Sequence, residues 1–419
     1  MRIRTMVTLV AVIAAAGCTR EATGPSPSAT ASRDVLVLDT GSTLVVGSGT
    51  GSLLAPDAGT LAAPDGSRIY AALSDGSWTA IETRDGTTGE VLATTSIPGR
   101  MALRAASVSG AALAFVDAPP NSDPWVPIPR ATTTLVVADP TGAGGPQRFR
   151  VRGNVEPEAF SIDDTHLFLI EYLPPQAPTV YRVTSLDLAT GEVDPVKGRF
   201  KTPPERMPGV RLSQVYDPAT EQLYTLYANQ PTGSSPSYGY GDQDAGADEA
   251  VTFIHVLNMR EGWAYCAGVP RAFWGQPASA QAMAASPDGR LLYVIDSERG
   301  EIMAMDTRTL RTVGSAQIAL GGEGDGRTTA QVSADGSTLF VGSASGGAVY
   351  AVDTSTFEVR DRWATSGSVS SLRLSPDGAR LWAALPDRLE VIDPANGSQI
   401  TSLSLPGVRQ ILAVSTPTT

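Results

Sequence analysis

The sequence is poor in the side chains that most often carry out catalysis or bind transition metals: it has two histidines and two cysteines among 419 residues. The histidines, His166 and His255, occur in no recognisable motif. No Ser–His–Asp triad, His-rich metal site or Gly-x-Ser-x-Gly elbow is evident. We therefore assign no catalytic residue from the sequence, and we interpret His255, which lies in an apolar segment, as a core or edge residue.

Lysine is nearly absent as well, occurring only at Lys197 and Lys201, and no run of basic residues is found. Acidic residues outnumber basic ones by 43 to 31, which gives a formal net charge of −12. Binding to nucleic acid requires a basic surface that neutralises phosphates, so we expect no nucleic-acid partner. After the first residues, no apolar run is long enough to span a bilayer.

Residues 1–17 have the features of an export signal. Arg2 and Arg4 give it a positively charged start, and residues 6–16 are apolar but too few to cross a bilayer. Its end, Ala15-Ala16-Gly17-Cys18, resembles a bacterial lipobox, in which a cysteine is acylated and becomes the mature N-terminus. We therefore expect lipidation of Cys18 and an extracytoplasmic protein that this lipid anchors to the bacterial cell membrane.

Residues 18–33 follow the signal and are rich in Ser, Thr, Pro and Gly, a composition that predicts a flexible tether. If Cys18 carries lipid, Cys266 has no partner for an intramolecular disulfide. We therefore predict that Cys266 is a small, buried apolar residue.

Four short stretches of the remaining chain have nearly the same sequence. Each is predicted to be a turn followed by an apolar strand. They begin at Ala63, Ser286, Ser333 and Ser375 and share Asp-Gly at their third and fourth positions. The last three recur with a period of about 45 residues, which is typical of β-propeller blades. In such turns the Asp side chain caps nearby amides and the glycine takes a positive φ. We therefore interpret the repeated Asp residues as turn caps rather than catalytic carboxylates.

The repeats predict an all-β fold, a single β-propeller over residues 34–419, with four antiparallel strands in each blade. We count seven blades, over residues 61–97, 101–151, 155–198, 210–268, 278–320, 327–365 and 367–405. Two fragments remain, 34–49 and 408–414, and joining them in one blade closes the ring. An eighth blade assembled from these fragments is the alternative.

The regular repeats resemble the YVTN family of bacterial propellers, which is related to WD40-like sheets. Leu292-Tyr293-Val294-Ile295 and Leu339-Phe340-Val341-Gly342 stand where that family has its tyrosine-valine strand. The Thr-Asn that usually follows this strand in the family is missing from this sequence. The resemblance implies an extracytoplasmic propeller and does not imply an activity.

Three consecutive blades have long links between their second and third strands, at residues 117–131, 172–178 and 229–250. Long links are usually functional, and their aromatic and Arg side chains are typical of binding hot spots. We expect them to bind an envelope protein or a glycan; the alternative is that they only pack over the edge of the ring. The candidate contact residues are Trp125, Arg130, Tyr172, Tyr238, Tyr240, Trp263, Arg271, Phe273 and Trp274.

The longest link contains an acidic cluster whose spacing resembles the start of a calcium-binding loop. The candidate ligands are Asp242, Asp244, Asp248 and Glu249. Phe253 stands where the bidentate Glu of such a loop belongs. We therefore favour a solvated acidic loop and expect no cofactor, with calcium as the alternative.

Two functions remain after these exclusions. The favoured one is a cell-envelope lipoprotein that acts as a non-catalytic binding or scaffold module. The alternative is a propeller hydrolase of the lactonase type, because such enzymes use scattered acidic, Arg and His residues in the central funnel and have no local motif.

Overall fold

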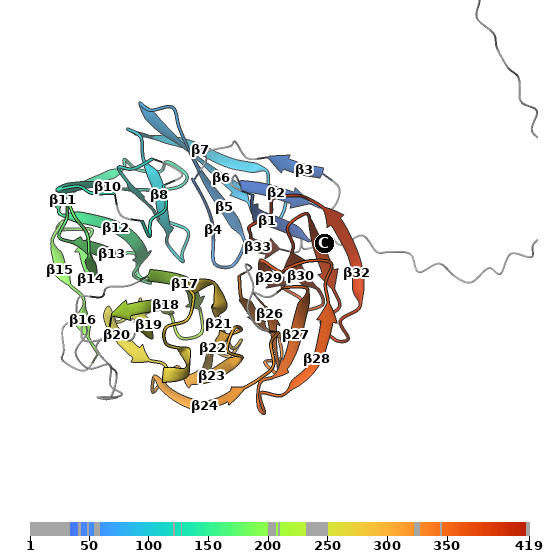
Figure 1. Cartoon of the computed structure of the whole chain (residues 1–419). Coiled ribbons are helices and arrows are strands. Elements are labelled where there is room, and N and C mark those ends of the chain that lie inside the picture. The colour runs from blue at the N-terminus through green and yellow to red at the C-terminus, as the bar shows by residue number, and fades with distance from the viewer. Residues whose placement is uncertain are drawn as a thin grey trace, which may run out of the picture. The chain divides into compact units, whose positions relative to one another are not determined.

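The apolar segments that follow the Asp-Gly turns form strands, and these strands assemble into four-stranded antiparallel sheets (Figure 1). The computed structural model describes residues 34–40, 43–47, 50–53, 59–119, 122–126, 128–199, 207, 210–231, 250–321, 327–343 and 346–415. The range Arg33–Thr419 forms one compact unit. The predicted signal, Cys18 and the tether lie outside the described residues.

In the first four blades, the main strands follow one another in chain order from the inner edge outward. Blade one has β4 (Gly59–Ala62), β5 (Arg68–Ser74), β6 (Trp78–Asp85) and β7 (Val91–Pro98). Blade two has β8 (Ala102–Ala106), β9 (Leu113–Val116), β10 (Thr132–Ala138) and β11 (Gln147–Arg152). Blade three has β12 (Asn154–Phe160), β13 (His166–Leu173), β14 (Val180–Asp187) and β15 (Val193–Pro195). Blade four has β17 (Val210–Asp217), β18 (Gln222–Pro231), β19 (Ala250–Asn258) and β20 (Trp263–Gly268), with β16 (Lys197–Gly198) added in parallel to β20.

The second half of the ring is more regular. Blade five follows two short 3₁₀ helices, η1 (Arg271–Phe273) and η2 (Ala278–Ala280), and has β21 (Gln281–Ala285), β22 (Leu291–Asp296), β23 (Glu301–Asp306) and β24 (Arg311–Gln317). Blade six has β25 (Thr329–Val332), β26 (Thr338–Gly342), β27 (Ala348–Asp353) and β28 (Val359–Ala364). Blade seven has β29 (Ser371–Leu374), β30 (Leu381–Ala384), β31 (Arg388–Ile392) and β32 (Gln399–Ser404).

The two fragments left over by the sequence pattern form, together with residues 50–53, a complete sheet of their own, which we name blade eight. Its order is β33 (Gln410–Ser415), β1 (Val35–Asp39), β2 (Thr43–Gly47) and β3 (Thr50–Leu53). The described residues therefore form eight sheets, so the arrangement is the eight-bladed alternative. A count of seven arises when the end fragments are assigned to closure alone, because they contain three of the strands and the fourth, β3, lies just outside them.

Blade eight joins the two ends of the propeller. β1 pairs antiparallel with β2 on one side and with β33 on the other. At the start of β1, the buried carboxylate of Asp34 accepts hydrogen bonds from Arg380 Nε (2.7 Å), Arg380 Nη2 (2.8 Å) and Trp382 Nε1 (2.8 Å). This charge-assisted contact ties the closing sheet to blade seven.

The predicted turn caps are confirmed. Asp65 Oδ1 accepts a hydrogen bond from the amide of Ser67, and Asp288 Oδ1 accepts one from the amide of Arg290. Gly289 has φ +66°, and a Cβ built on it meets Ala219 Cβ at 2.6 Å, so only glycine fits this turn. The turns at Asp335 and Asp377 repeat the cap.

The core lies between neighbouring blades rather than within any one of them. Each apolar cluster draws side chains from the facing sheets of two adjacent blades. One such cluster, between blades three and four, contains Tyr172, Tyr181, Tyr227 and Phe253. A single blade cannot bury both of its faces, and stacking around the ring completes that burial.

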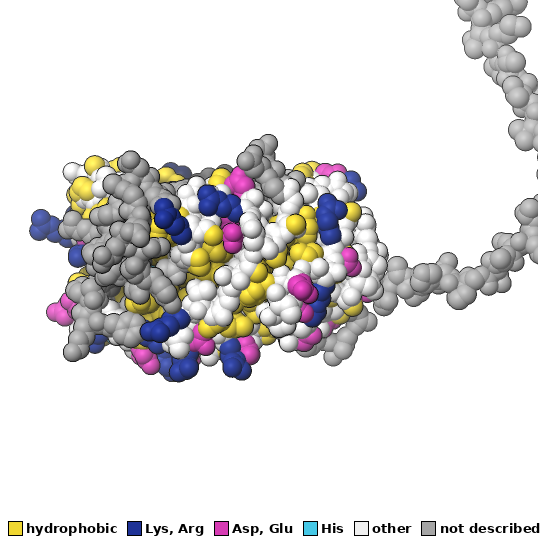
Figure 2. Space-filling view, turned by 60° about the horizontal axis from the view of Figure 1, so that its bottom comes forward, with side chains coloured by type: hydrophobic (Ala, Val, Ile, Leu, Met, Phe, Trp, Pro, Cys, Tyr) yellow, Lys and Arg dark blue, Asp and Glu magenta, His cyan; other side chains and the backbone are white. Residues whose placement is uncertain are grey.

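On the face shown in Figure 2, basic and acidic side chains are interspersed among hydrophobic ones, without a large area of one sign. Among the described residues, no helix is long and apolar enough to cross a membrane.

Candidate binding site at the inner rim

The inner strands of the blades begin on the same face of the propeller as the links between second and third strands. In blade two this link is residues 117–131, between β9 and β10, and in blade three it is residues 174–179, between β13 and β14. The two links touch, because the amide of Arg130 donates to the carbonyl of Pro175 (3.2 Å). We call this region, where the link 117–131 meets β8, β12 and β17, the inner rim.

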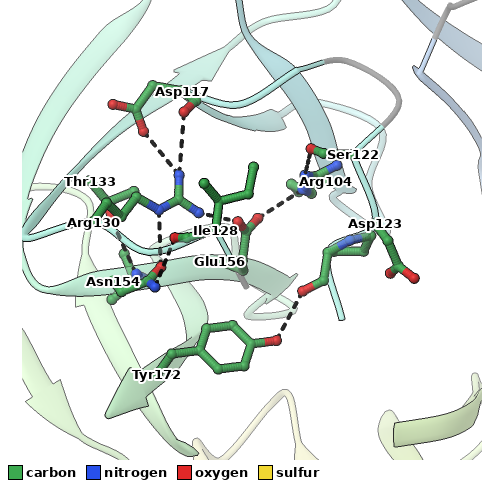
Figure 3. Close-up of polar contacts among 12 residues, drawn as sticks. Arg104, Asp117, Ser122, Asp123, Ile128, Arg130, Thr133, Asn154, Glu156 and Tyr172 are labelled. Carbon is green, nitrogen blue, oxygen red and sulfur yellow. Dashed lines mark hydrogen bonds and ion pairs between the residues drawn. The ribbon is translucent and has the colours of Figure 1, made fainter. Parts of the chain in front are cut away.

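A buried carboxylate between two arginines forms the centre of the inner rim (Figure 3). Glu156 Oε2 accepts from Arg104 Nε at 2.8 Å, and Glu156 Oε1 accepts from Arg130 Nη2. The exposed fractions of the three side chains are 3% for Glu156, 4% for Arg104 and 11% for Arg130. Ions removed from water this completely persist only when paired, so the three groups hold one another in place.

Further hydrogen bonds fold the link 117–131 onto this centre. Arg130 pairs with Asp117 (Nη1–Oδ1, 3.2 Å) and donates from Nε to Asn154 Oδ1 (3.0 Å). Asn154 Nδ2 donates to the carbonyls of Ile128 (3.0 Å) and Pro175 (3.1 Å). The described residues of the link are thus held in place by Arg130 and by Asn154 of blade three.

Two more contacts hold the middle of the link. Arg104 Nη2 donates to Ser122 Oγ at 2.6 Å, and the Tyr172 hydroxyl donates to the carbonyl of Pro124 at 2.9 Å. Burial raises the pKa of Tyr172 to about 12, so its hydroxyl keeps its proton and remains a donor. Tyr172 is therefore a buried support for the link and not a contact surface.

Trp125 lies above a second ion pair. The guanidinium carbon of Arg211 is 4.7 Å from the centre of the Trp125 ring, which is a cation–π contact. Arg211 Nη2 and Gln214 Nε2 each donate to Glu158 Oε1 at 2.9 Å. Burial raises the pKa of Glu158, with the Arg211 charge opposing the shift. Its other oxygen, Oε2, is buried without a hydrogen-bond partner among the described residues.

The outer surface of the link includes exposed apolar side chains. Val126 is 65% exposed and Ile128 is 39% exposed, and Trp125, which contacts Arg211, is half-buried. A rigid, charged base therefore holds apolar side chains out to solvent, an arrangement suited to contact with another macromolecule.

One cation at the inner edge of the ring has no carboxylate partner among the described residues. Arg373, on β29, donates from Nε to the carbonyl of Ile411 on β33 (3.2 Å). Its side chain is exposed, yet the loss of surrounding bulk water lowers its pKa. Both facts fit a guanidinium that projects toward the centre of the ring.

The structure brings together only part of the predicted contact surface. Trp125, Arg130 and Tyr172 meet at the inner rim. Trp274 is half-buried and donates from Nε1 to the carbonyl of Val269 (3.2 Å), and Arg271 is exposed at the start of η1. Phe273 is fully buried in the core between blades four and five, because η1 turns its ring inward.

Trp263 lies on the opposite face from the long links. The register of β19 and β20 pairs Trp263 with Asn258, whereas Phe253, near the long link, pairs with Gly268. Trp263 lines a cavity of about 640 Å³ with Arg199, whose guanidinium lies 4.8 Å from the Trp263 ring. Tyr238, Tyr240 and the calcium candidates Asp242, Asp244, Asp248 and Glu249 lie outside the described residues.

Sequence reasoning missed Arg104, Glu156, Glu158 and Arg211, which form the base of the site. The available signal was a charged residue at alternate positions of otherwise apolar inner strands, as in Asn154–Phe160. No group of three or more His, Cys, Asp or Glu side chains suited to a metal ion occurs in the part of the chain that the structure describes.

Comparison with known proteins supports the fold alone. No protein-family model and no curated protein matches the chain. Among solved structures, dihydro-heme d1 dehydrogenase NirN in complex with DHE aligns over 93% of this chain and 76% of its own, with a TM-score of 0.54 and 15% identity. Apo AztD from Citrobacter koseri aligns over 91% of this chain and 97% of its own, with a TM-score of 0.55 and 10% identity.

Proposed function

We propose that this β-propeller is a lipid-anchored, extracytoplasmic binding module whose partner is an envelope protein that docks on the inner rim. The observation that carries the proposal is the pre-formed link 117–131, in which a buried Arg–Glu–Arg centre holds apolar side chains at the surface. A link already fixed in its bound shape loses little entropy on association, which favours affinity.

The apolar and aromatic side chains of the rim support a protein partner. Val126 and Ile128 offer exposed apolar area, and Trp125 adds an aromatic side chain of the kind that dominates protein hot spots. Anchoring rests on the lipobox at Ala15-Ala16-Gly17-Cys18. The proposal requires no cofactor.

The direct test is capture of the partner from solubilised envelope by the full chain and by Trp125→Ala. We expect the substitution to weaken capture by about 1–3 kcal/mol, or roughly 5- to 150-fold, with little loss of stability. Trp263→Ala is the matched control, because Trp263 is also half-buried against an arginine, Arg199, but lies on the opposite face of the propeller. Equal losses for the two variants, or no loss for Trp125→Ala, contradict docking at the rim, and capture of glycan alone contradicts a protein partner.

The anchor has a separate test. Mass spectrometry of the membrane-fraction protein is expected to show acylated Cys18 at the N-terminus. Release of the protein into the medium, or an unmodified N-terminus in the membrane fraction, contradicts the anchored form.

A second candidate function is hydrolysis of a lactone-type ester, and Glu158 is the observation that favours it. Its raised pKa and its unpartnered Oε2 are properties of a general acid or base. Arg211 beside it is placed to stabilise a developing oxyanion. Lactone turnover that Glu158→Gln abolishes, while partner capture persists, supports this function; no turnover by the wild-type chain removes it.

A further inference from the structure

A row of polar side chains crosses the sheet of blade four, on the face that packs against blade three. Gln214 Nε2 donates to Thr225 Oγ1 at 3.1 Å. Thr225 is paired in register with His255, and His255 with Cys266. Directly paired residues of antiparallel strands project from the same face, so these side chains lie next to one another from the inner strand to the outer one.

Two sulfur atoms meet at the outer end of this row. Cys266, which is half-buried rather than fully buried as predicted, donates from Sγ to Met207 Sδ at 3.7 Å. Met207 is buried and is held by backbone hydrogen bonds with Tyr181 of blade three. Two sulfurs that each bind one metal at about 2.3 Å, at a tetrahedral angle, lie roughly 3.8 Å apart. The observed separation matches this value.

The imidazole of His255 completes the group. It is 1% exposed, and neither ring nitrogen has a hydrogen-bond partner among the described residues. The ring lies edge-on to the ring of Tyr227, with the two ring centres 6.3 Å apart. A neutral imidazole has a lone pair on one ring nitrogen, and burying it without a partner is unfavourable.

We propose that Cys266 Sγ, Met207 Sδ and a ring nitrogen of His255 bind one copper(I) ion. Thiolate and thioether sulfur select Cu(I), whereas Ca²⁺ and Mg²⁺ require oxygen ligands. Binding replaces the Cys266 thiol proton with the ion, and the proton is released to solvent through the exposed part of that residue. Thiolate and Cu(I) together are neutral, which suits a site near the positive charge of Arg211. The proposal does not depend on the binding function of the inner rim.

The test is an anaerobic titration of the full chain with Cu(I) in competition with a colorimetric Cu(I) chelator. We expect one ion per chain. Cys266→Ser, Met207→Leu and His255→Leu are each expected to weaken binding by about tenfold or more, since even outer-shell changes at metal sites reach that size. Cys18→Ser and Met303→Leu are matched controls and are expected to bind as the wild type does. Met303 is a buried methionine of the neighbouring core, away from Cys266.

A second measurement keeps the proposal testable if His255→Leu fails to fold. One equivalent of Cu(I) is expected to protect Cys266 from alkylation by iodoacetamide in the wild type but not in Met207→Leu, a nearly volume-conserving change. Absence of stoichiometric Cu(I) binding, unchanged binding in Cys266→Ser, or tighter binding of Zn(II) than of Cu(I) overturns the proposal. X-ray absorption that shows two sulfur and one nitrogen neighbours around copper confirms the ligand set.

Discussion

Removal of the carboxylate at the centre of the inner rim gives the sharpest test of the site. Glu156→Ala leaves Arg104 and Arg130 without the oxygen atoms that each contacts at the centre of the rim. Both guanidiniums are almost fully shielded from water, so neither recovers hydration unless the link 117–131 opens. In the variant, therefore, either two arginine charges stay buried without the Glu156 carboxylate or the link is displaced.

The size of the effect follows from the contacts that remain. Removing one partner of a buried ion pair costs about 3–5 kcal/mol. Arg130 retains Asp117 and Asn154, and Arg104 retains Ser122, which places the expected loss near the middle of that range, at about 4 kcal/mol. Chemical denaturation of the full chain, followed by tryptophan fluorescence, measures this loss.

Glu171→Ala is the matched control, because Glu171 pairs with Arg182 on the same blade at a more exposed site, with 16% of the Glu171 and 36% of the Arg182 side chain exposed. We expect it to lose about 1 kcal/mol or less. Trypsin gives an independent measurement, since cleavage after Arg130 is expected to accelerate only in Glu156→Ala. Equal losses in the two variants, or unchanged cleavage after Arg130, refute the view that Glu156 holds the link.

Three further predictions concern ring closure, the turns and pH. Asp34→Ala removes the acceptor of Arg380 and Trp382 and is expected to cost about 3–4 kcal/mol in denaturation; a loss below about 1 kcal/mol contradicts its role in closure. Gly289→Val forces a side chain into a positive φ and a crowded turn, with about 3 kcal/mol lost and partner capture unchanged. Burial raises the pKa of Glu158 above its usual 4.5, so folding favours the protonated form of this side chain. The stability that protonated Glu158 contributes is therefore complete below pH 4.5 and falls as the pH rises through the raised pKa. Glu158→Gln is therefore expected to flatten the fall in stability as pH rises above 4.5, measured by denaturation at a series of pH values, and an unchanged slope contradicts the shift.

The sequence was sufficient for the fold where local chemistry decides the structure. Each Asp-Gly turn depends on an Asp side chain that caps an amide two residues later and on one glycine with a positive φ, as at Asp288 and Gly289. Both requirements are local, so each repeat can be recognised in the sequence. Blade eight lacked such a signal, because β1 and β33 become partners only through a pairing that spans nearly the whole chain. The propeller was therefore predictable, and the strands that close it were open to two interpretations.

The site was predictable only in part, for the same physical reason. Trp125 and Arg130 were found because a long Pro-rich link is visible in the sequence. Glu156 pairs with Arg130 of the preceding blade, and Arg211 pairs with Glu158 of the preceding blade. No local sequence pattern indicates either contact, because each joins segments that only the closed ring brings together. Trp263 was assigned to the wrong face because its position depends on the register of one hairpin.

The closing sheet also sets an order of events during biogenesis. The Ser415 side chain reaches the carbonyl of Val35 across 380 positions of chain, and β33 forms the innermost strand of its blade. The other seven sheets are each built from neighbouring segments and can form while the chain is being synthesised. The closing sheet can form only after β33 has been synthesised. Until then β1 offers an unpaired edge. A chain whose synthesis is incomplete thus remains an open ring, exposed to proteases and to pairing with other chains, and the final strand closes it in a single late step.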